Sequence, residues 1–416
     1  MQEIKPKRVL ILTADAGFGH RSAANAVKAA LLQKYKDNVL VDIVNPLDDK
    51  RAPFFLRDSQ SDYDKIVRNL PELYRVGYET SDTKLFIPVI ENALIALLFE
   101  VIRDLVKQNQ PDVILSTYPI YQAPLIAVRT IYRYPIPIYT VVTDLVSVHR
   151  IWFNPLIDRY FVPTEVVSEL AQKSRVMAEK IEITGIPVSP DFTTLKADKD
   201  SLRSELGWEL GKTTILAVGS RRVEHLETTL NVLNHSGYDL QIVCVAGKDR
   251  SLFNQLKQIQ WHKPTHIYEF VSEMPKFLLA SDCLISKAGG LIVSESLAAG
   301  LPLILIDIIP GQETGNAEFV VNQGAGEIAM DSVSVLETVS HWLQDDKKAL
   351  QDCTKNAKAL GKPEAAITIA ESIWKGQKQS QDGDTYLTKD LRENLVRLLT
   401  QHKIEIPVDS VFNKKK

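Results

Sequence analysis

The sequence predicts an α/β protein built from two Rossmann-like domains, each with a parallel sheet covered by helices on both faces. Short apolar runs alternate with helical patterns along the chain, which is typical of doubly wound sheets. The same alternation begins again after a charged connector near residues 190–200. The chain has 416 residues, more than a single core usually supports, so two domains are expected.

The first half is expected to form an N-terminal domain over residues 1–190. Helical patterns such as RSAANAVKAALLQKY and ENALIALLFEVIRDLVKQ separate its apolar runs. The runs that predict strands are RVLILTA (8–14), NVLVDIVNP (38–46), PDVILSTYP (111–119), PIYTVVTD (137–144), DRYFVPT (158–164) and IEITGIPV (181–188).

The second half is expected to form a C-terminal domain over residues 200–375. Its predicted strands are TTILAVGS (213–220), LQIVCVAG (240–247), THIYEFV (265–271), DCLISKAGG (282–290), LPLILIDI (301–308) and GEIAM (326–330). Residues 376–416 begin as a polar linker and continue as the amphipathic pattern LTKDLRENLVRLLTQH, which we expect to dock on one of the domains.

Composition excludes several classes of function. The net charge is −3 and basic residues are dispersed, so nothing favours a nucleic-acid partner. Three cysteines lie far apart, two of them in apolar runs, which argues against disulfides and a zinc site and favours a reducing compartment. The N-terminus lacks the pattern of a secretory signal, and the longest apolar stretch, residues 85–102, is interrupted by polar residues and proline. We therefore expect no transmembrane helix.

A glycine turn in the second half has the features of a nucleotide-sugar site. The strand ending in DCLISK is followed by Gly289 and Gly290 and then by a helix whose first amides are free to bind a diphosphate. Glu295 falls on the second helical turn, where its carboxylate is suited to the hydroxyls of a ribose. After the next strand, PGQETGN offers Gln312, Glu313 and Asn316 for the hydroxyls of a sugar.

A second glycine turn, AGFGHRSAA, follows the first strand of the chain. Gly17 and Gly19 allow close approach of the backbone to phosphates, and His20 lies at the start of the next helix. The positive end of a helix dipole favours a neutral imidazole, which is the form a general base requires.

These two stretches resemble known families. SKAGGLIVSESLAAGLPLILIDIIPGQETGNAEF is similar to the nucleotide-sugar signature of glycosyltransferase family 28. AGFGHRSAANAV is similar to the turn of the monogalactosyldiacylglycerol synthases and diacylglycerol glucosyltransferases. The likeness continues through LPELYRVGYETSD, PDVILSTYPIYQAP, TVVTDLVSVHRIWFNPLIDRYFVPTE and ITGIPVSPDF, so it covers most of residues 8–330.

The resemblance implies the GT-B fold, in which two Rossmann-like domains face a central cleft. It implies an inverting transfer of galactose or glucose from a UDP-sugar to the hydroxyl of diacylglycerol, with the lipid on the N-terminal domain and the UDP-sugar mainly on the C-terminal one. No metal or other cofactor is expected, because the sequence has no Asp-x-Asp pair near either glycine turn.

The resemblance also suggests roles for single residues. His20 matches the general base, and Asp144 matches an aspartate expected to orient it or to stabilise the imidazolium. Trp152, with Phe153, matches an aromatic pair and is expected to contact the acceptor. Phe270 and Val271 match the loop that holds the uracil in that family.

Two positions depart from the family pattern. A glycine-rich turn is common after the first strand of the C-terminal domain, but here only Gly219 remains and Ser220 and Arg221 are expected to contact phosphate instead. Tyr118 replaces a common histidine and is expected to line the acceptor site, although a tyrosine does not titrate at neutral pH.

A lipid acceptor requires contact with a bilayer surface. Segment 53–80 mixes aromatic and basic residues and is the expected contact, so the protein is predicted to be peripheral on the cytoplasmic face of the membrane. Three alternatives remain open. They are a transferase for another lipid such as a polyprenyl-linked sugar, a UDP-sugar 2-epimerase with the same architecture, and a nucleotide-sugar sensor without catalytic activity.

Overall fold

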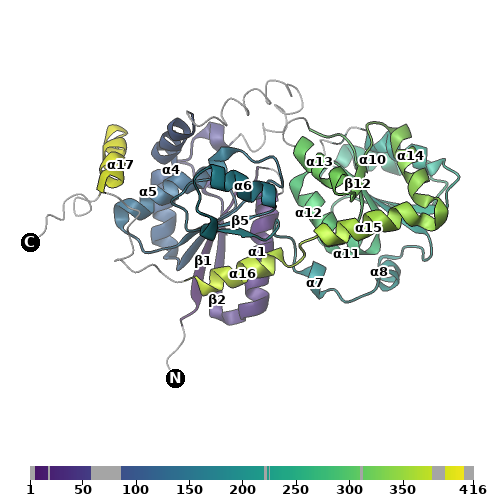
Figure 1. Ribbon diagram of the computed structural model, residues 1–416, viewed down its shortest axis with the longest axis horizontal. Coiled ribbons are helices and arrows are strands. Elements are labelled where there is room, and N and C mark those ends of the chain that lie inside the picture. The colour runs from purple at the N-terminus through teal and green to yellow at the C-terminus, as the bar shows by residue number, and fades with distance from the viewer. Residues whose placement is uncertain are drawn as a thin grey trace, which may run out of the picture. The chain divides into compact units, whose positions relative to one another are not determined.

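The computed structural model describes residues 5–16, 19–57, 86–219, 223, 225–309, 313–376 and 389–406. The chain divides into two compact units, each a sheet covered by helices (Figure 1). Unit 1 comprises Met1–Asp144, Val148–Pro187 and Ala365–Lys416, and unit 2 comprises Leu145–Ser147 and Val188–Glu364.

Unit 1 contains the predicted strands of the first half, each somewhat shorter than its apolar run. The strands are β1 (Lys7–Leu12), β2 (Val39–Val44), β3 (Val113–Ser116), β4 (Ile138–Val141), β5 (Arg159–Val162) and β6 (Ile181–Ile183). The α-helices are α1 (Gly19–Tyr35), α4 (Ile87–Asn109), α5 (Gln122–Tyr132), α6 (Glu165–Lys173), α16 (Ala365–Lys375) and α17 (Lys389–Gln401). Short 3-10 helices are η1 (Lys36–Asn38), η2 (Pro46–Asp48), η3 (Pro119–Tyr121), η4 (Arg150–Trp152) and η5 (Ala178–Lys180).

The strands of unit 1 form a parallel sheet in the order β2-β1-β3-β4-β5-β6. Side chains alternate across β1, as the period of a strand requires. Val9 and Ile11 belong to a core cluster with α1 and α16, whereas Leu10 and Leu12 belong to the cluster with α4 and α5. Helices therefore cover both faces, which explains why the strands are nearly continuous apolar runs.

Helix α16 differs from the expected domain boundary at residue 375. It packs on the sheet of unit 1 beside α1, not on unit 2 (Figure 1). Ile369 and Ile373 are fully buried there, Trp374 stacks on Tyr35 with ring centroids 4.1 Å apart, and Nζ of Lys7 donates to the carbonyl of Trp374 at 2.7 Å. The apolar stripe of α16 is buried on a sheet that is distant in sequence.

The C-terminal helix α17 docks as predicted. It packs against α5 and α4 of unit 1, and its Leu395 and Leu399 are buried in the core cluster of those helices. No helix in the described ranges is long and apolar enough to cross a membrane.

Unit 2 repeats the architecture. Its strands are β7 (Thr213–Val218), β8 (Leu240–Val245), β9 (Thr265–Tyr268), β10 (Cys283–Ser286), β11 (Leu303–Leu305) and β12 (Gly326–Ile328). Its helices are α7 (Asp191–Thr194), α8 (Lys199–Leu206), α9 (Leu226–Asn234), α10 (Arg250–Gln258), α11 (Met274–Ala280), α12 (Gly290–Ala298), α13 (Thr314–Asn322), α14 (Ser332–Leu343), η6 (Asp345–Lys347) and α15 (Lys348–Leu360).

The sheet of unit 2 is parallel and has the order β12-β11-β10-β7-β8-β9. Counted within the unit, this is the strand order of the classical dinucleotide-binding fold. Ile215 and Ala217 of β7 pack into a core cluster with α9, α10 and α14, and the intervening Leu216 is also fully buried. The chain thus contains the two Rossmann-like units of the GT-B fold, as predicted.

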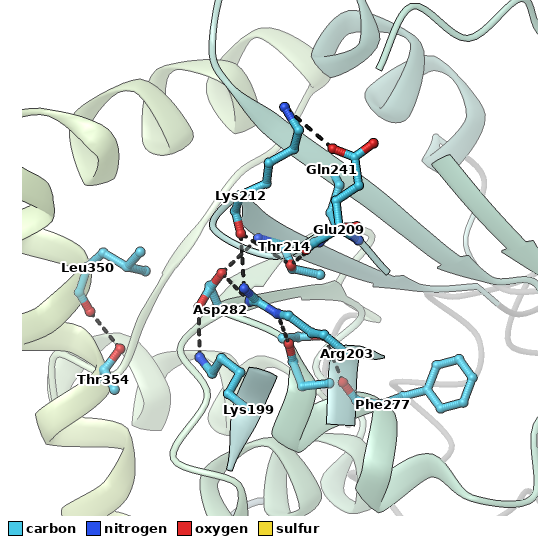
Figure 2. Close-up of polar contacts among 12 residues, drawn as sticks. Lys199, Arg203, Glu209, Lys212, Thr214, Gln241, Phe277, Asp282, Leu350 and Thr354 are labelled. Carbon is cyan, nitrogen blue, oxygen red and sulfur yellow. Dashed lines mark hydrogen bonds and ion pairs between the residues drawn. The ribbon is translucent and has the colours of Figure 1, made fainter. Parts of the chain in front are cut away.

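A polar network locks the amino end of this second sheet (Figure 2). Asp282, just before β10, accepts hydrogen bonds from Nζ of Lys199, a guanidinium nitrogen of Arg203 and the amide of Thr214, each at 2.7 Å. Arg203, which is 4% exposed, also donates to the carbonyls of Ala280 and Lys212. Burial raises the pKa of Asp282, but the cations and the amide outweigh it, so the pKa lies below its usual value.

Candidate active site

The turn after β1 lies at the topological switch point of the first sheet. β1 pairs with β2 on one side and with β3 on the other, and ligands of doubly wound sheets bind at the carboxyl ends of strands at such a point. The ends of β1 and β3 are joined here. The amide of Thr117 donates to the carbonyl of Leu12 at 2.9 Å, and the Thr117 hydroxyl donates to that of Thr13 at 2.9 Å.

His20 is the second residue of α1, and its ring is fixed by these strand ends. Its Nδ1 lies 2.9 Å from the carbonyl oxygen of Thr117, after β3, and 2.7 Å from Oγ1 of Thr143, after β4. The Thr117 hydroxyl also lies 3.1 Å from the carbonyl oxygen of His20. Residues about a hundred positions apart in sequence therefore hold one imidazole.

The contact with Thr117 assigns the tautomer of His20. A carbonyl oxygen only accepts hydrogen bonds, so Nδ1 carries the ring proton and Nε2 carries the lone pair. Burial lowers the pKa of His20 to about 4, although the bond to Thr117 opposes the shift. The imidazole is therefore neutral at neutral pH, with Nε2 in the form that accepts a proton.

Two aromatic rings lie beside the imidazole. Tyr118 packs edge-on against it with centroids 4.8 Å apart, and Trp152 lies at 6.0 Å with its plane tilted by 38°. Tyr118 is half-buried, whereas Trp152 is only 1% exposed. Trp152 therefore exposes little surface to an acceptor, and its expected contact with the acceptor stays a prediction.

The carboxylate of Asp144 bonds to Trp152, and it is not a partner of Nδ1 of His20. Its Oδ2 accepts a hydrogen bond from the indole Nε1 of Trp152 at 2.7 Å. Burial raises the pKa of Asp144 to about 6, with the Trp152 bond opposing the shift. The expected direct pairing is corrected in this structure, because the hydroxyl of the preceding residue, Thr143, occupies the position beside Nδ1. Asp144 thus bonds to the indole that lies beside His20.

The turn before His20 contains the two predicted glycines. Gly17 lies outside the described residues. At Gly19, no atom of the described residues lies within 4 Å of the place where a Cβ would be, so none of them requires glycine there. Arg21, the residue after His20, forms a bidentate ion pair with Asp15, and both N–O distances are 2.8 Å.

The second sheet has its own switch point between β7 and β10. Gly219 directly follows β7, and its amide donates to the carbonyl of Val245 at 2.8 Å. A Cβ at Gly219 would lie 2.5 Å from Cδ2 of Leu252, so a larger residue at this position would have to displace that side chain. Ser220 and Arg221, expected to contact phosphate, lie outside the described residues.

The diglycine turn after β10 has the predicted form. Gly289 is the extended residue before α12, Gly290 is the first residue of that helix, and no side chain caps the helix start. Glu295, on the second turn, is half-buried and forms no hydrogen bond or ion pair with any described residue. Burial alone raises its pKa to about 7. An unpaired, partly buried carboxylate is costly to the fold and is typical of a site that awaits a hydrogen-bonding ligand.

A buried ion pair lies beside the diglycine turn. Glu313, 3% exposed, pairs with Nζ of Lys287, and its other oxygen accepts from the amide of Ile309 at 3.3 Å. Nζ of Lys287 would lie 3.0 Å from a Cβ at Gly289, so the cation is adjacent to this turn. Sequence reasoning missed Lys287, although its position between strand β10 and the glycines was a usable signal.

Asn316 joins the same cluster. Its Nδ2 donates to the carbonyl of Ala288 at 2.9 Å, and this bond fixes the orientation of the amide. Its Oδ1 is buried and has no hydrogen-bond partner in the part of the chain that is described. Gln312, predicted alongside it, falls outside that part. An orphaned acceptor beside a glycine turn is suited to a ligand hydroxyl.

The expected uracil loop follows β9. Phe270 is 62% exposed and Val271 is half-buried, so neither belongs to the core of unit 2. Among the described residues, no group of three or more His, Cys, Asp or Glu side chains is placed to hold a metal ion.

Two family models match the chain. Residues 20–188 match the model described as monogalactosyldiacylglycerol (MGDG) synthase, and residues 215–373 match the glycosyltransferase family 28 C-terminal domain. The first match includes strands β2 to β6 of the first sheet, and the second includes most of β7, strands β8 to β12 and most of α16.

Curated plant proteins resemble the chain over most of its length. The monogalactosyldiacylglycerol synthase of Spinacia oleracea is 32% identical over 378 residues, which cover 88% of this chain and 72% of that protein. The probable monogalactosyldiacylglycerol synthase of Glycine max is 33% identical over 379 residues, covering 89% of this chain and 71% of that protein. Both relatives are described as chloroplastic.

Solved structures share the fold at low sequence identity. MurG from Acinetobacter baumannii has a TM-score of 0.56 and 16% identity, covering 89% of this chain and all of that one. A UDP-GlcNAc 2-epimerase from Neisseria meningitidis has a TM-score of 0.59 and 15% identity, with coverage of 89% and 100%. These similarities show the fold alone. The family models and the sequence relatives establish that the chain is a glycosyltransferase of the monogalactosyldiacylglycerol synthase family.

Proposed function

We propose that this enzyme transfers galactose or glucose from a UDP-sugar to the hydroxyl of diacylglycerol, with inversion at the anomeric carbon. The observation that carries the proposal is His20, a neutral imidazole at a strand-end switch point whose Nε2 lone pair is left available. A single in-line attack needs a base that removes the proton of the acceptor hydroxyl within hydrogen-bond reach. His20 supplies that base.

The donor binds at the switch point of unit 2 in this proposal. The amides at the start of α12 receive the diphosphate, and the carboxylate of Glu295 accepts the ribose hydroxyls. Glu313, Asn316 and Gln312 bind the sugar. Lys287 lies beside Gly289 and would neutralise charge that develops on the leaving diphosphate, which supports a reaction without a metal ion. Gly219, Ser220 and Arg221 contribute the second phosphate contact, and Phe270 and Val271 hold the uracil.

The lipid acceptor requires reversible contact with a bilayer surface. The expected contact, segment 53–80, is described only up to residue 57, but Phe54 and Phe55 in that part are 67% and 52% exposed. Phe86 and Val89, at the start of the next described range, are 50% and 64% exposed. Exposed aromatic and aliphatic residues of this kind support an interfacial contact of unit 1. A cytoplasmic-face location is part of this proposal.

Product analysis tests the proposed reaction. The full chain is incubated with UDP-galactose or UDP-glucose and with liposomes of phosphatidylcholine that contain diacylglycerol, with and without a chelator. Mass analysis and anomeric assignment of the lipid should show one β-linked hexose per diacylglycerol, formed equally well with the chelator. Release of a free 2-epimer without lipid, or transfer only to a polyprenyl-linked sugar, would contradict the proposal and favour one of its alternatives.

Vesicle binding tests the membrane contact separately. Phe54→Ser/Phe55→Ser should reduce sedimentation with the same liposomes while UDP binding, which belongs to unit 2, stays unchanged. The matched control is Val166→Ser, which alters an exposed apolar residue of α6 in the same unit. Equal loss of sedimentation in both variants would show that the two phenylalanines have no special role.

A further inference from the structure

The Nδ1 atom of His20 has two oxygen neighbours but only one proton to share. The Thr117 carbonyl lies at 2.9 Å and the Thr143 hydroxyl at 2.7 Å. The carbonyl already fixes the tautomer, since it is an acceptor and nothing else. Selection of the tautomer therefore does not explain the closer oxygen, Oγ1 of Thr143, a residue that is 5% exposed.

We propose that Thr143 is a positioning residue for the reaction, whose hydroxyl acts as a second acceptor for the Nδ1 proton and stabilises the imidazolium formed during transfer. The inference rests on the proposed role of His20 as the base. In that step Nε2 takes the proton of the lipid hydroxyl, the hydroxyl oxygen bonds to the anomeric carbon, and the bond from that carbon to UDP breaks with its electron pair leaving on UDP. The proton later passes from Nε2 to solvent.

A neutral acceptor suits this task better than a carboxylate at the same place. A carboxylate on Nδ1 would stabilise the charged imidazolium in the resting enzyme and keep part of the base protonated. An uncharged hydroxyl forms only an ordinary hydrogen bond with the neutral ring, and this bond strengthens when the ring becomes charged. The stabilisation therefore appears mainly in the transition state, where it raises the rate.

The other described side chains around the ring do not supply this acceptor. Asp144 is bonded to the indole of Trp152, Tyr118 presents the edge of its ring, and Arg21 on the same helix is paired with Asp15. In the part of the chain that the structure describes, Thr143 is thus the side chain whose hydroxyl contacts Nδ1 and can respond to a charge on the imidazole.

The chain provides a matched control. Thr140 lies in β4, three residues before Thr143, and is fully buried, and its hydroxyl has no hydrogen-bond partner among the described residues. Thr140→Val and Thr143→Val remove the same atom from neighbouring buried positions. Only the second removes a contact with His20.

The experiment compares Thr143→Val, Thr143→Ser and Thr140→Val. For Thr143→Val we expect kcat to fall about tenfold or more, because a hydrogen bond to a charged group is lost, while KM for the UDP-sugar stays within about twofold. Thr143→Ser should retain most of the rate, since the hydroxyl is kept, and Thr140→Val should match the wild type.

A spectroscopic readout separates this inference from the proposed function. In protein with 15N-labelled histidine, assigned with a His20→Gln variant, the ring nitrogens of His20 should show a proton on Nδ1 and none on Nε2. The Hδ1 resonance should move upfield in Thr143→Val and stay in place in Thr143→Ser and Thr140→Val. This result would support the positioning role even if another acceptor lipid were found.

Several results would overturn the inference. A kcat for Thr143→Val equal to that of Thr140→Val would show that the hydroxyl does not act in the reaction. A proton on Nε2 in the wild-type spectrum would show the opposite tautomer, and no further variant would be needed. If Thr143→Val fails to fold, failure of Thr143→Ser to keep both the rate and the Hδ1 position would decide against it.

Discussion

The two ends of the second sheet differ in how their partly buried carboxylates are bonded. At the amino end, Asp282 accepts three hydrogen bonds from Lys199, Arg203 and Thr214, and its pKa is lowered (Figure 2). At the carboxyl end, Glu295 has no partner among the described residues, and burial raises its pKa to about 7. The first carboxylate stabilises the fold, whereas the second is left free to bind.

The same division holds within unit 1. Arg129 and Asp158 pair at 2.5 Å, and Asp158 also accepts from the amide of Ile138, at the amino end of β4. At the carboxyl ends of β1, β3 and β4, His20 is held at Nδ1 and keeps an acceptor at Nε2. In both sheets, the carboxylate near the amino end of a strand is paired within the fold, whereas His20 and Glu295, near carboxyl ends, keep capacity for a ligand.

The largest expected effect is on the rate of transfer, when His20 at the carboxyl end of the first sheet is replaced. His20→Ala should lower the rate of transfer by about 10²–10⁴-fold, the usual contribution of a general base, while UDP still binds. Single-turnover rates and calorimetric titration with UDP measure the two quantities. The matched control is His235→Ala, which removes an exposed histidine of unit 2 that bonds to the carbonyl of Asn231 and packs on His262, and it should leave the rate unchanged.

The next effect concerns the amino end of the second sheet. Asp282→Ala leaves the guanidinium of Arg203 buried without its anion, so the free energy of unfolding should fall by about 3–5 kcal/mol. Because the pKa of Asp282 is lowered by folding, its contribution is present above the unfolded pKa and is lost as the pH falls through the folded value. Thermal unfolding across acid pH measures this loss. Asp282→Asn, which keeps one acceptor, should lose less, and an equal loss in both would argue that the ion pairs are dispensable.

The third prediction concerns Glu295. Glu295→Gln should weaken UDP binding about tenfold, because hydrogen bonds to a charged carboxylate are replaced by weaker ones. The pKa near 7 is raised from its usual value, so the wild-type carboxylate costs stability as the pH rises through 7, and Glu295→Gln should unfold at a higher temperature than the wild type above that pH. UDP titrations and melting curves on either side of neutral pH measure both effects. Tighter binding combined with lower stability would refute the assignment of Glu295 as a ligand group.

The smallest effect is expected for Asp144. Its raised pKa of about 6 implies that the carboxylate becomes neutral as the pH falls through 6, which removes a negative charge from the surroundings of His20. The wild-type rate should therefore decline by a few-fold below pH 6, and Asp144→Asn should show the lower rate without this dependence. Rate profiles of the two proteins test the point, and a decline that persists in Asp144→Asn would assign the titration to another group.

Much of the fold could be predicted because its determinants are local. Each strand of both sheets was visible as an apolar run, and glycines after β7 and β10 marked the turns at a strand-end switch point. The start of α1 at Gly19 likewise placed His20 on the first helix. Helix α16 was assigned to the wrong unit, because an apolar stripe indicates that a face is buried but not which sheet buries it.

The partners of the site residues could not be predicted from local pattern. The contacts of His20 with Thr117 and Thr143 join residues 97 and 123 positions apart. Asp144 bonds to Trp152 where a bond to His20 was expected. The ion pair of Lys287 with Glu313 could not be predicted either, because it depends on how close the end of β10 lies to the turn before α13.

By itself the sequence determined the two parallel sheets, the positions of their glycine turns and the residue types that these turns carry. These features follow from hydrophobic periodicity and backbone freedom, which act over a few residues. Only the tertiary structure decided which nitrogen of His20 holds the proton, which carboxylates remain unpaired and which unit α16 joins. Each of these depends on a hydrogen bond or contact between segments far apart in the chain, and no short stretch of sequence contains both partners.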